Sequence, residues 1–386
     1  MKQYALKLLL KVLVWQQQGR TKSPFIPQSI RSALFVEMTR FGDVVSALPA
    51  IQSLRTCCPE ATISVAVQEQ FSGILENIKG IDRIFRLRST TSIGGLKKAA
   101  KELRQQKFDL AMSMSPSMRN ALLTLRTDSR AKIGYFKPVE GVTPFLHTFN
   151  VMGLGIELAQ KSVYDKENIS VRAKKVLETM GIPWVNDMSW SIPAPINARV
   201  VDKLVRLRVD PGQHLIIIHP FAGWEFREWK FERYLETAQR LSHQRAMPVL
   251  LIGTKMELDR VRQSVSGSGS DMNIHLYAID DISEFPALLN RADLFIGNDS
   301  GPMHLAAMMG VPCVGLYGPA SPEYTAPVSD RAQWLFHQVE CSPCGQVHCV
   351  RPENPCVHLI AVDEVVGAAE ALLADPRNGI SRSGSV

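Results

Sequence analysis

The chain has 386 residues, of which 45% are hydrophobic and 21% are charged. This length is more than one hydrophobic core usually serves, so we expect about two domains, and the composition excludes a collagen, a coiled coil and a disordered chain. The formal net charge is +7, but the first 31 residues hold six basic residues and no acidic one, so the remainder is close to neutral. A nucleic-acid-binding core is therefore not expected, because it would need Lys and Arg clustered on the folded domain.

Residues 1–31 are predicted to form a basic, amphipathic N-terminal extension. Its apolar stretch from Leu6 to Trp15 is interrupted by Lys7 and Lys11, which lie one helical turn apart on the same face. The stretch is shorter than the roughly 20 apolar residues of a transmembrane helix, and no small-residue cleavage site follows it. We expect an interfacial helix on an anionic membrane surface; the alternative is a helix packed on the body of the protein.

From residue 32 onward, strand-like runs alternate with helix-like runs, which is typical of parallel sheets covered by helices. In the first half the predicted strands are Ala33–Met38, Thr62–Val67, Asp82–Leu87, Phe108–Met114 and Ala131–Tyr135. The predicted helices are Val44–Thr56, Phe71–Ile78, Leu96–Gln106, Met118–Arg126 and Lys166–Met180. These elements predict a doubly wound, Rossmann-like domain over residues 32–190, followed by a Pro- and Gly-rich linker near Gly181–Pro195.

The second half repeats the alternation. Its predicted strands are Leu215–His219, Pro248–Gly253, Asn273–Ala278, Asp293–Gly297 and Pro312–Tyr317. Its predicted helices are Phe231–His243, Met256–Val265, Glu284–Arg291, Pro302–Met309 and a closing helix at Val362–Leu373. We assign residues 191–375 to a second Rossmann-like domain and 376–386 to a flexible tail. Because ligands bind at the carboxyl ends of strands in such sheets, the site is expected in the cleft between the domains.

The turn after the first strand carries no glycine-rich fingerprint of a dinucleotide-binding or P-loop protein, which disfavours both classes. It carries Asp43 instead, close to the start of a helix. An aspartate there serves either as a helix cap or as a catalytic base, and both roles remain open.

A second candidate follows the strand that ends at Gly297. Here Asp299, Ser300, Gly301, Pro302, Met303 and His304 lie at the end of a strand and the start of a helix. Pro302 suits the first helical position, and the neighbouring amides would hold a diphosphate through the helix dipole. Asp299 could accept hydrogen bonds from sugar hydroxyls, although a well-capped helix would look similar.

Two further candidates come from neighbouring strand ends. Arg227 lies in the long loop after His219 and could neutralise a departing diphosphate, unless it is a solvated arginine beside a core tryptophan. Glu257 could bind a ribose hydroxyl or be an exposed acid at a helix start. No Asp-x-Asp pair occurs in the chain, so a metal-held nucleotide sugar is not expected and no cofactor is predicted.

Seven cysteines without an export signal indicate a reducing cytoplasm rather than a disulfide framework. Four of them fall within sixteen residues, at Cys341, Cys344, Cys349 and Cys356. They would either bind a metal or form a reduced structural loop, since the spacing is tighter than in the usual zinc site.

The chain resembles the lipopolysaccharide heptosyltransferases of glycosyltransferase family 9, over about residues 32–375. The motifs that carry this resemblance are ALFVEMTRFGDVVSALPAIQSLR at 33–55, HPFAGWEFREWKFERY at 219–234, LLIGTKMELDRV at 250–261, RADLFIGNDSGPMHLAAMMGVPCVGLYGP at 291–319, and the cysteine run. The resemblance implies the two-domain GT-B fold and inverting transfer of a heptose from ADP-heptose to a saccharide of the lipopolysaccharide inner core. It also implies a cytoplasmic enzyme, peripheral on the inner membrane.

By the same resemblance, Asp43 matches the acid proposed to deprotonate the acceptor, with Arg40 and Gly42 beside it on the acceptor side. Arg227 stands where the family usually has a lysine that contacts the donor phosphates. Asp299 matches the donor-sugar residue, Ser300–His304 the diphosphate turn, and Glu257 an acid near the ribose. Independently of the resemblance, acceptor contacts are expected from the first-domain loops Ser113–Arg119 and Tyr135–His147, with Lys137 and Arg130 near them; the alternative is a solvated surface. The alternatives are a family member with another nucleotide sugar or a protein acceptor, and a non-catalytic nucleotide-binding member.

Overall fold

The computed structural model describes residues 27–88, 92–115, 117–133, 169–186, 188, 190–266, 273–344, 346 and 348–376. The predicted N-terminal helix, the Tyr135–His147 segment with Lys137, and the tail beyond residue 376 lie outside these residues. Within them, no helix combines the length and apolar character needed to cross a membrane. The chain forms two compact units, Met1–Ser191 and Ile192–Val386.

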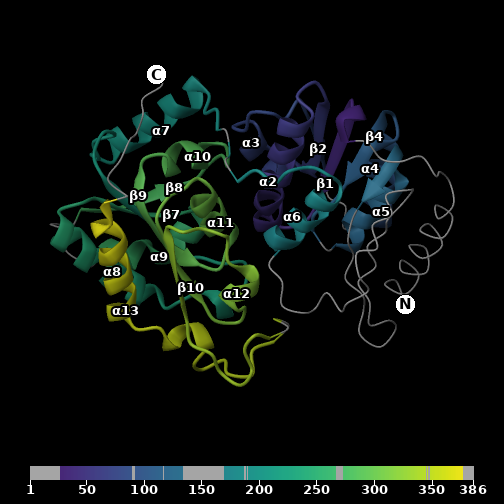
Figure 1. Cartoon of the computed structure of the whole chain (residues 1–386). Helices are drawn as coiled ribbons and strands as arrows, with labels where there is room; N and C mark the ends of the chain where they lie inside the picture. Colours follow the sequence, from purple (N-terminus) through teal and green to yellow (C-terminus); the bar gives the residue numbers. More distant parts are fainter. Residues whose placement is uncertain are drawn as a thin grey trace. The chain divides into compact units, whose positions relative to one another are not determined.

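Unit 1 is built on a five-stranded parallel sheet (Figure 1). Its strands are β1 (Ser32–Glu37), β2 (Thr62–Gln68), β3 (Arg83–Leu87), β4 (Lys107–Met112) and β5 (Asp128–Ile133). Its helices are η1 (Pro27–Ser29), α2 (Phe41–Cys57), η2 (Glu69–Phe71), α3 (Ser72–Leu75), α4 (Ile93–Leu103), α5 (Met118–Arg126) and α6 (Ile169–Thr179). The strands lie in the order β3, β2, β1, β4, β5.

Helices cover both faces of this sheet, as its apolar central strand requires. Leu34 and Val36 of β1 face a cluster that includes Ala99 and Leu103 of α4 and Leu123 of α5. Because side chains alternate along a strand, Phe35 faces the opposite side, where α2 packs against β1, β2 and α6.

Unit 2 is built on a six-stranded parallel sheet. Its strands are β6 (Leu215–His219), β7 (Val249–Gly253), β8 (Ile274–Ala278), β9 (Ala292–Asn298), β10 (Cys313–Tyr317) and β11 (Ala332–Phe336). Its helices are α7 (Ala194–Arg206), η3 (Glu225–Arg227), α8 (Phe231–Arg245), α9 (Lys255–Ser266), α10 (Glu284–Leu289), α11 (Gly301–Met308), α12 (Pro322–Thr325), η4 (Cys356–Leu359) and α13 (Val362–Ala374). The strands lie in the order β11, β10, β9, β6, β7, β8.

The core of unit 2 also has two layers. Leu294 and Ile296 of β9 belong to the cluster formed with α8 and α13, while Phe295 between them points to the other face and meets Phe285 of α10 at 6.4 Å between ring centroids. Figure 1 shows α8 and α13 side by side at the edge of the unit. Helices therefore cover both faces of the sheet, and a ligand would bind at the ends of its strands.

Each sheet has one point at which the strand order reverses: successive strands are added towards one edge of the sheet up to this point, and towards the other edge after it. In unit 1 the reversal lies between β1 and β4, and in unit 2 between β6 and β9. Loops leaving two such strands at their carboxyl ends diverge, which opens a crevice suited to a ligand.

The structure corrects the predicted elements in five places. Helix α7 begins at Ala194, inside the stretch interpreted as a linker, and the strand β11 and the short helix α12 were not predicted. The predicted helix Phe71–Ile78 is reduced to η2 and the single turn α3. Pro302 is the second residue of α11 rather than the first.

Candidate active site

The crevice of unit 2 brings Arg227 and Asp299 into contact. Arg227 ends η3, in the loop after β6, and Asp299 directly follows β9. The guanidinium Nη1 donates to the Asp299 carbonyl oxygen at 3.2 Å and lies 3.4 Å from the carboxylate oxygen Oδ2. The Arg227 side chain is 19% exposed and that of Asp299 is 8% exposed. Arg227 is thus a partly buried residue of the crevice and not a solvated arginine.

The side chain of Asn298, the last residue of β9, holds the loop that carries Arg227 next to Asp299. The Asn298 side chain is fully buried; it donates to the Pro220 carbonyl at 2.8 Å and accepts from the Trp229 amide at 3.0 Å. Pro220 and Trp229 are the two ends of the loop that carries Arg227, so one amide group ties that loop to the end of β9. Trp229 is itself buried and donates from Nε1 to the Ile360 carbonyl.

The turn into α11 supplies a helix N-terminus next to Asp299. Ser300 is the N-cap residue with an extended backbone, and the first backbone bond of the helix runs from the His304 amide to the Ser300 carbonyl. The Ser300 hydroxyl is buried and, within the described residues, has no hydrogen-bond partner. The His304 ring nitrogen Nε2 lies 3.8 Å from the Asp299 carboxylate. Amides that precede the first helical bond, here those of Gly301 and Met303, are suited to bind an anion.

Glu257 lies at the end of the adjacent strand β7, as the third residue of α9. Its Oε2 accepts from both the amide and the hydroxyl of Thr254, at 2.8 Å each, and the Thr254 hydroxyl accepts from the Glu257 amide. This is a reciprocal capping box. Glu257 therefore caps the start of α9, as the helix-start alternative predicted, but it is half-buried rather than exposed. A ribose contact would use the other carboxylate oxygen.

Beside Glu257, His219 closes the end of β6 as a buried, neutral ring. Burial lowers the pKa of His219 to about 4, with the negative charge of Glu257 acting weakly in the opposite direction. The His219 ring meets Phe221 edge to face at 5.9 Å between centroids. His219 contributes packing rather than charge to the crevice.

In unit 1, Asp43 follows β1 as the third residue of α2. Its carboxylate Oδ2 accepts from the Arg40 amide at 3.2 Å, so Asp43 satisfies the helix N-terminus from inside the first turn rather than as the cap residue. Asp43 and Gly42 are both partly exposed. The carboxylate thus keeps access to solvent and to a ligand while its backbone position is fixed.

Glu37, which the sequence analysis did not single out, lies at the carboxyl end of β1 in the same crevice. Its carboxyl group is fully buried and accepts from the Met114 amide at 2.6 Å, from the Ser115 hydroxyl at 2.5 Å and from the Asn120 side chain at 3.2 Å. Burial, with a smaller contribution from the charge of Asp43, raises the pKa of Glu37 to about 8. The predicted acceptor loop Ser113–Arg119 is therefore anchored to β1 through this one carboxyl group.

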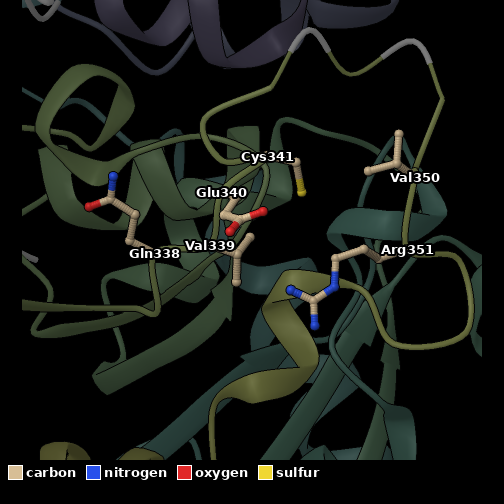
Figure 2. Close-up of a pocket in the computed structure, with 6 residues that line it drawn as sticks. All are labelled: Gln338, Val339, Glu340, Cys341, Val350 and Arg351. Carbon is tan, nitrogen blue, oxygen red and sulfur yellow. The ribbon is translucent and has the colours of Figure 1, made fainter.

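The four clustered cysteines line one pocket of about 250 Å³ in unit 2, together with Trp224, Phe226, Pro319, Gln346, His348, Val350 and Arg351. All seven cysteines of the chain are free thiols. Across the described ranges, no three His, Cys, Asp or Glu side chains are arranged to hold a metal ion. A neighbouring pocket of about 800 Å³ is lined by residues from two stretches of the same segment (Figure 2), and Cys341, Val350 and Arg351 line both.

The predicted residues therefore gather in two groups. Arg227, Asp299, Ser300 and His304 lie together in the crevice of unit 2, and Glu257 is in the first turn of α9, which follows β7, the neighbour of β6. Asp43, Arg40 and Gly42 belong to unit 1. Sequence reasoning missed two residues. One is Glu37, and the other is Gln346, which lies between Cys344 and Cys349 and contacts Arg227 through its side chain. An acid at the end of an otherwise apolar strand was a readable signal for Glu37, whereas the sequence held none for Gln346.

Comparison with known proteins gives one consistent result. The family model "Glycosyltransferase family 9 (heptosyltransferase)" matches residues 96–354. The lipopolysaccharide core heptosyltransferase OpsX of Haemophilus influenzae is 23% identical, over 80% of this chain and 84% of its own length. A family 9 glycosyltransferase from Veillonella parvula superposes with a TM-score of 0.72 at 21% identity, covering 90% of this chain and 98% of that one. The ADP-heptose LPS heptosyltransferase II of Escherichia coli superposes with a TM-score of 0.65 at 18% identity, covering 90% and 99%. The fold is accordingly GT-B, and the chain belongs to glycosyltransferase family 9 and is a glycosyltransferase.

Proposed function

We propose that this enzyme transfers a heptose from ADP-heptose to a saccharide of the lipopolysaccharide inner core, with inversion at the anomeric carbon. The observation that carries the proposal is the contact of Arg227 with Asp299 at the strand-order reversal of unit 2. A cation, a carboxylate and a helix N-terminus converge there, which is the chemistry required to hold a sugar linked to a diphosphate.

In the donor half, each group has a distinct task. Arg227 and the N-terminal amides of α11 neutralise the diphosphate, while Asp299 accepts hydrogen bonds from hydroxyls of the donor sugar. The buried Ser300 hydroxyl, which has no partner in the described part of the chain, is available to donate to a phosphate oxygen. Glu257 contacts the ribose with the carboxylate oxygen that its capping box does not use.

In the acceptor half, Asp43 is the general base, with Arg40 and Gly42 on the acceptor side. Its carboxylate takes the proton of the acceptor hydroxyl as the hydroxyl oxygen forms a bond to the anomeric carbon. The bond from that carbon to the ADP oxygen breaks on the opposite face, and the electron pair leaves with ADP. Such a single displacement inverts the anomeric configuration, and Arg227 stabilises the charge that develops on the leaving diphosphate.

Neutralisation by Arg227 and a helix N-terminus makes a divalent cation unnecessary for donor binding. The proposal therefore includes metal-independent transfer, with full activity in a chelator such as EDTA. It also includes a cytoplasmic enzyme held at the inner membrane by residues 1–31, since that extension carries the basic, apolar pattern of an interfacial helix.

The test is release of ADP from ADP-heptose, with a set of truncated lipopolysaccharide cores as acceptors. We expect turnover by the native chain, a loss of at least about 10²-fold in kcat for Asp43→Ala with donor binding retained, and weaker donor binding for Asp299→Ala. Asp128→Ala and Asp202→Ala, at exposed positions of unit 1 and unit 2, are matched controls and should keep native rates.

Other results would point to the alternatives. Turnover with another nucleotide sugar, or of a protein acceptor, would make the enzyme a different transferase of the same family. Binding of nucleotide without turnover of any acceptor would favour a non-catalytic member.

A further inference from the structure

Gln346 holds the edge of the Arg227 guanidinium that faces away from Asp299. The side-chain oxygen of Gln346 accepts from Nε of Arg227 at 2.8 Å and also from Nη2, while Nη1 is the nitrogen that meets Asp299. All three nitrogens of the guanidinium are therefore engaged, from two residues 47 positions apart in the chain. A guanidinium bound on both sides has one orientation left.

The acceptor on the Gln346 side is neutral. Asp299 already places one negative charge beside Arg227. A second carboxylate would cancel the attraction of this site for a diphosphate, whereas an amide oxygen orients the guanidinium and leaves its charge available. An uncharged acceptor is the choice expected where the arginine serves an anionic ligand.

The backbone of Gln346 also has an uncommon conformation. Its φ is +56°, in the left-handed region that residues other than glycine seldom adopt. Such a conformation persists where the surrounding structure imposes it, and it is concentrated at functional positions. Here it occurs at the residue whose side chain reaches Arg227.

The segment that carries Gln346 is anchored on both sides. On one side, the Ser342 hydroxyl donates to the Gly318 carbonyl at 2.6 Å and the Cys344 amide donates to the Pro319 carbonyl at 2.9 Å. On the other, His358 Nε2 lies 3.1 Å from the Glu228 carbonyl, next to Arg227 in sequence. The segment therefore reaches Arg227 from fixed supports.

We propose that Gln346 is a positioning residue for the donor: it fixes the Arg227 guanidinium in the orientation that binds the diphosphate of the nucleotide. This rests on the proposed function, because the diphosphate is that of the proposed donor. The role predicts that Gln346 acts only through Arg227.

A double-mutant cycle on ADP binding tests this dependence. Calorimetry is run with ADP on the native chain, Gln346→Met, Arg227→Ala and the double variant; methionine keeps the length of the side chain and removes the acceptor. We expect Gln346→Met to weaken ADP binding about tenfold in the native background, the effect of losing a hydrogen bond to a charged group, and to change nothing further in Arg227→Ala. Gln338→Met, in the same segment, is the matched control and should bind ADP normally.

Thermal unfolding of each variant separates this effect from a folding defect, since a change of affinity at unchanged Tm is not a loss of structure. Unchanged ADP affinity in Gln346→Met, or an equal further loss in the Arg227→Ala background, would overturn the positioning role. ADP binding without heptose transfer would defeat the proposed function and leave the role of Gln346 to be decided by the cycle. A native chain that binds no ADP would overturn both.

Discussion

Asn120 donates from its side-chain amide to the buried carboxyl group of Glu37 at 3.2 Å, and its carbonyl oxygen accepts from the backbone amide of Met38 at 3.0 Å. The two residues thereby connect the end of β1 to α5, across the strand-order reversal of unit 1. Burial raises the pKa of Glu37 to about 8, so its carboxyl group stays protonated up to about that pH.

Glu37 should make the stability of the protein fall as the pH rises through neutrality. The carboxyl titrates near 4.5 in the unfolded chain and near 8 in the fold, so between these values the native state binds more protons than the unfolded state. Glu37→Gln removes this titration. From about pH 5 to about pH 8 the Tm of the native chain should therefore fall by about 2–4 °C more than that of the variant.

The measurement is circular dichroism at a series of pH values. Glu60→Gln, at an exposed position of the same unit, is the control and should follow the native curve. Parallel curves for the native chain and Glu37→Gln would contradict the prediction.

His219 should produce the opposite slope at lower pH. Its pKa is about 4 in the fold and near 6.5 in the unfolded chain, so the unfolded state binds the extra proton between these values. The stabilising contribution of the neutral ring is complete above about pH 6.5 and is lost as the pH falls towards about 4. His219→Asn should flatten this part of the stability curve in urea denaturation, while His243→Asn, at an exposed position, should not.

The geometry around Arg227 predicts that charge alone is insufficient. A lysine at 227 keeps the positive charge, but a single ammonium group cannot reproduce the planar fork that joins Gln346 to Asp299. We expect Arg227→Lys to lower kcat/KM about tenfold and Arg227→Ala to lower it about 10²- to 10³-fold, because the alanine removes the charge that stabilises the leaving group. Steady-state ADP release measures both; equal losses in the two variants would show that geometry outweighs charge.

The capping box of α9 allows the structural and binding roles of Glu257 to be separated. Thr254→Val removes the hydroxyl that caps the helix and should cost about 1 kcal/mol of unfolding free energy without changing ADP affinity. Glu257→Ala should lower both quantities. Urea denaturation and calorimetry on the same samples test this, and an ADP affinity unaffected by Glu257→Ala would remove Glu257 from the donor half.

The sequence predicted strands best where they are buried on both faces. Leu215–His219 is a continuous apolar run, and its limits coincide with β6. The edge strand β11 was missed because its apolar run, Trp334–Phe336, is only three residues long, and all five residues of the strand are only half-buried. Helix α7 was missed because its first turn contains Pro195, interpreted as a linker residue although proline is compatible with a helix start.

At the candidate site, sequence reasoning located the strand ends but not the contacts between them. Arg227 and Asp299 are each recognisable from their place after a strand, and their contact follows from the strand order. The contact of Gln346 with Arg227 depends on the path of an irregular segment whose supports are hydrogen bonds to Gly318 and Pro319. No periodicity or local propensity encodes such a path.

The buried amide of Asn298 has a mechanical consequence. Because it binds both ends of the loop that carries Arg227, any force that a bound nucleotide exerts on this loop is transmitted to the end of β9 and to the turn at Asp299. We therefore expect the loop that carries Arg227 and the turn at Asp299 to respond together when nucleotide binds. Hydrogen exchange would register this as simultaneous slowing of the Trp229 and Asp299 amides when nucleotide binds.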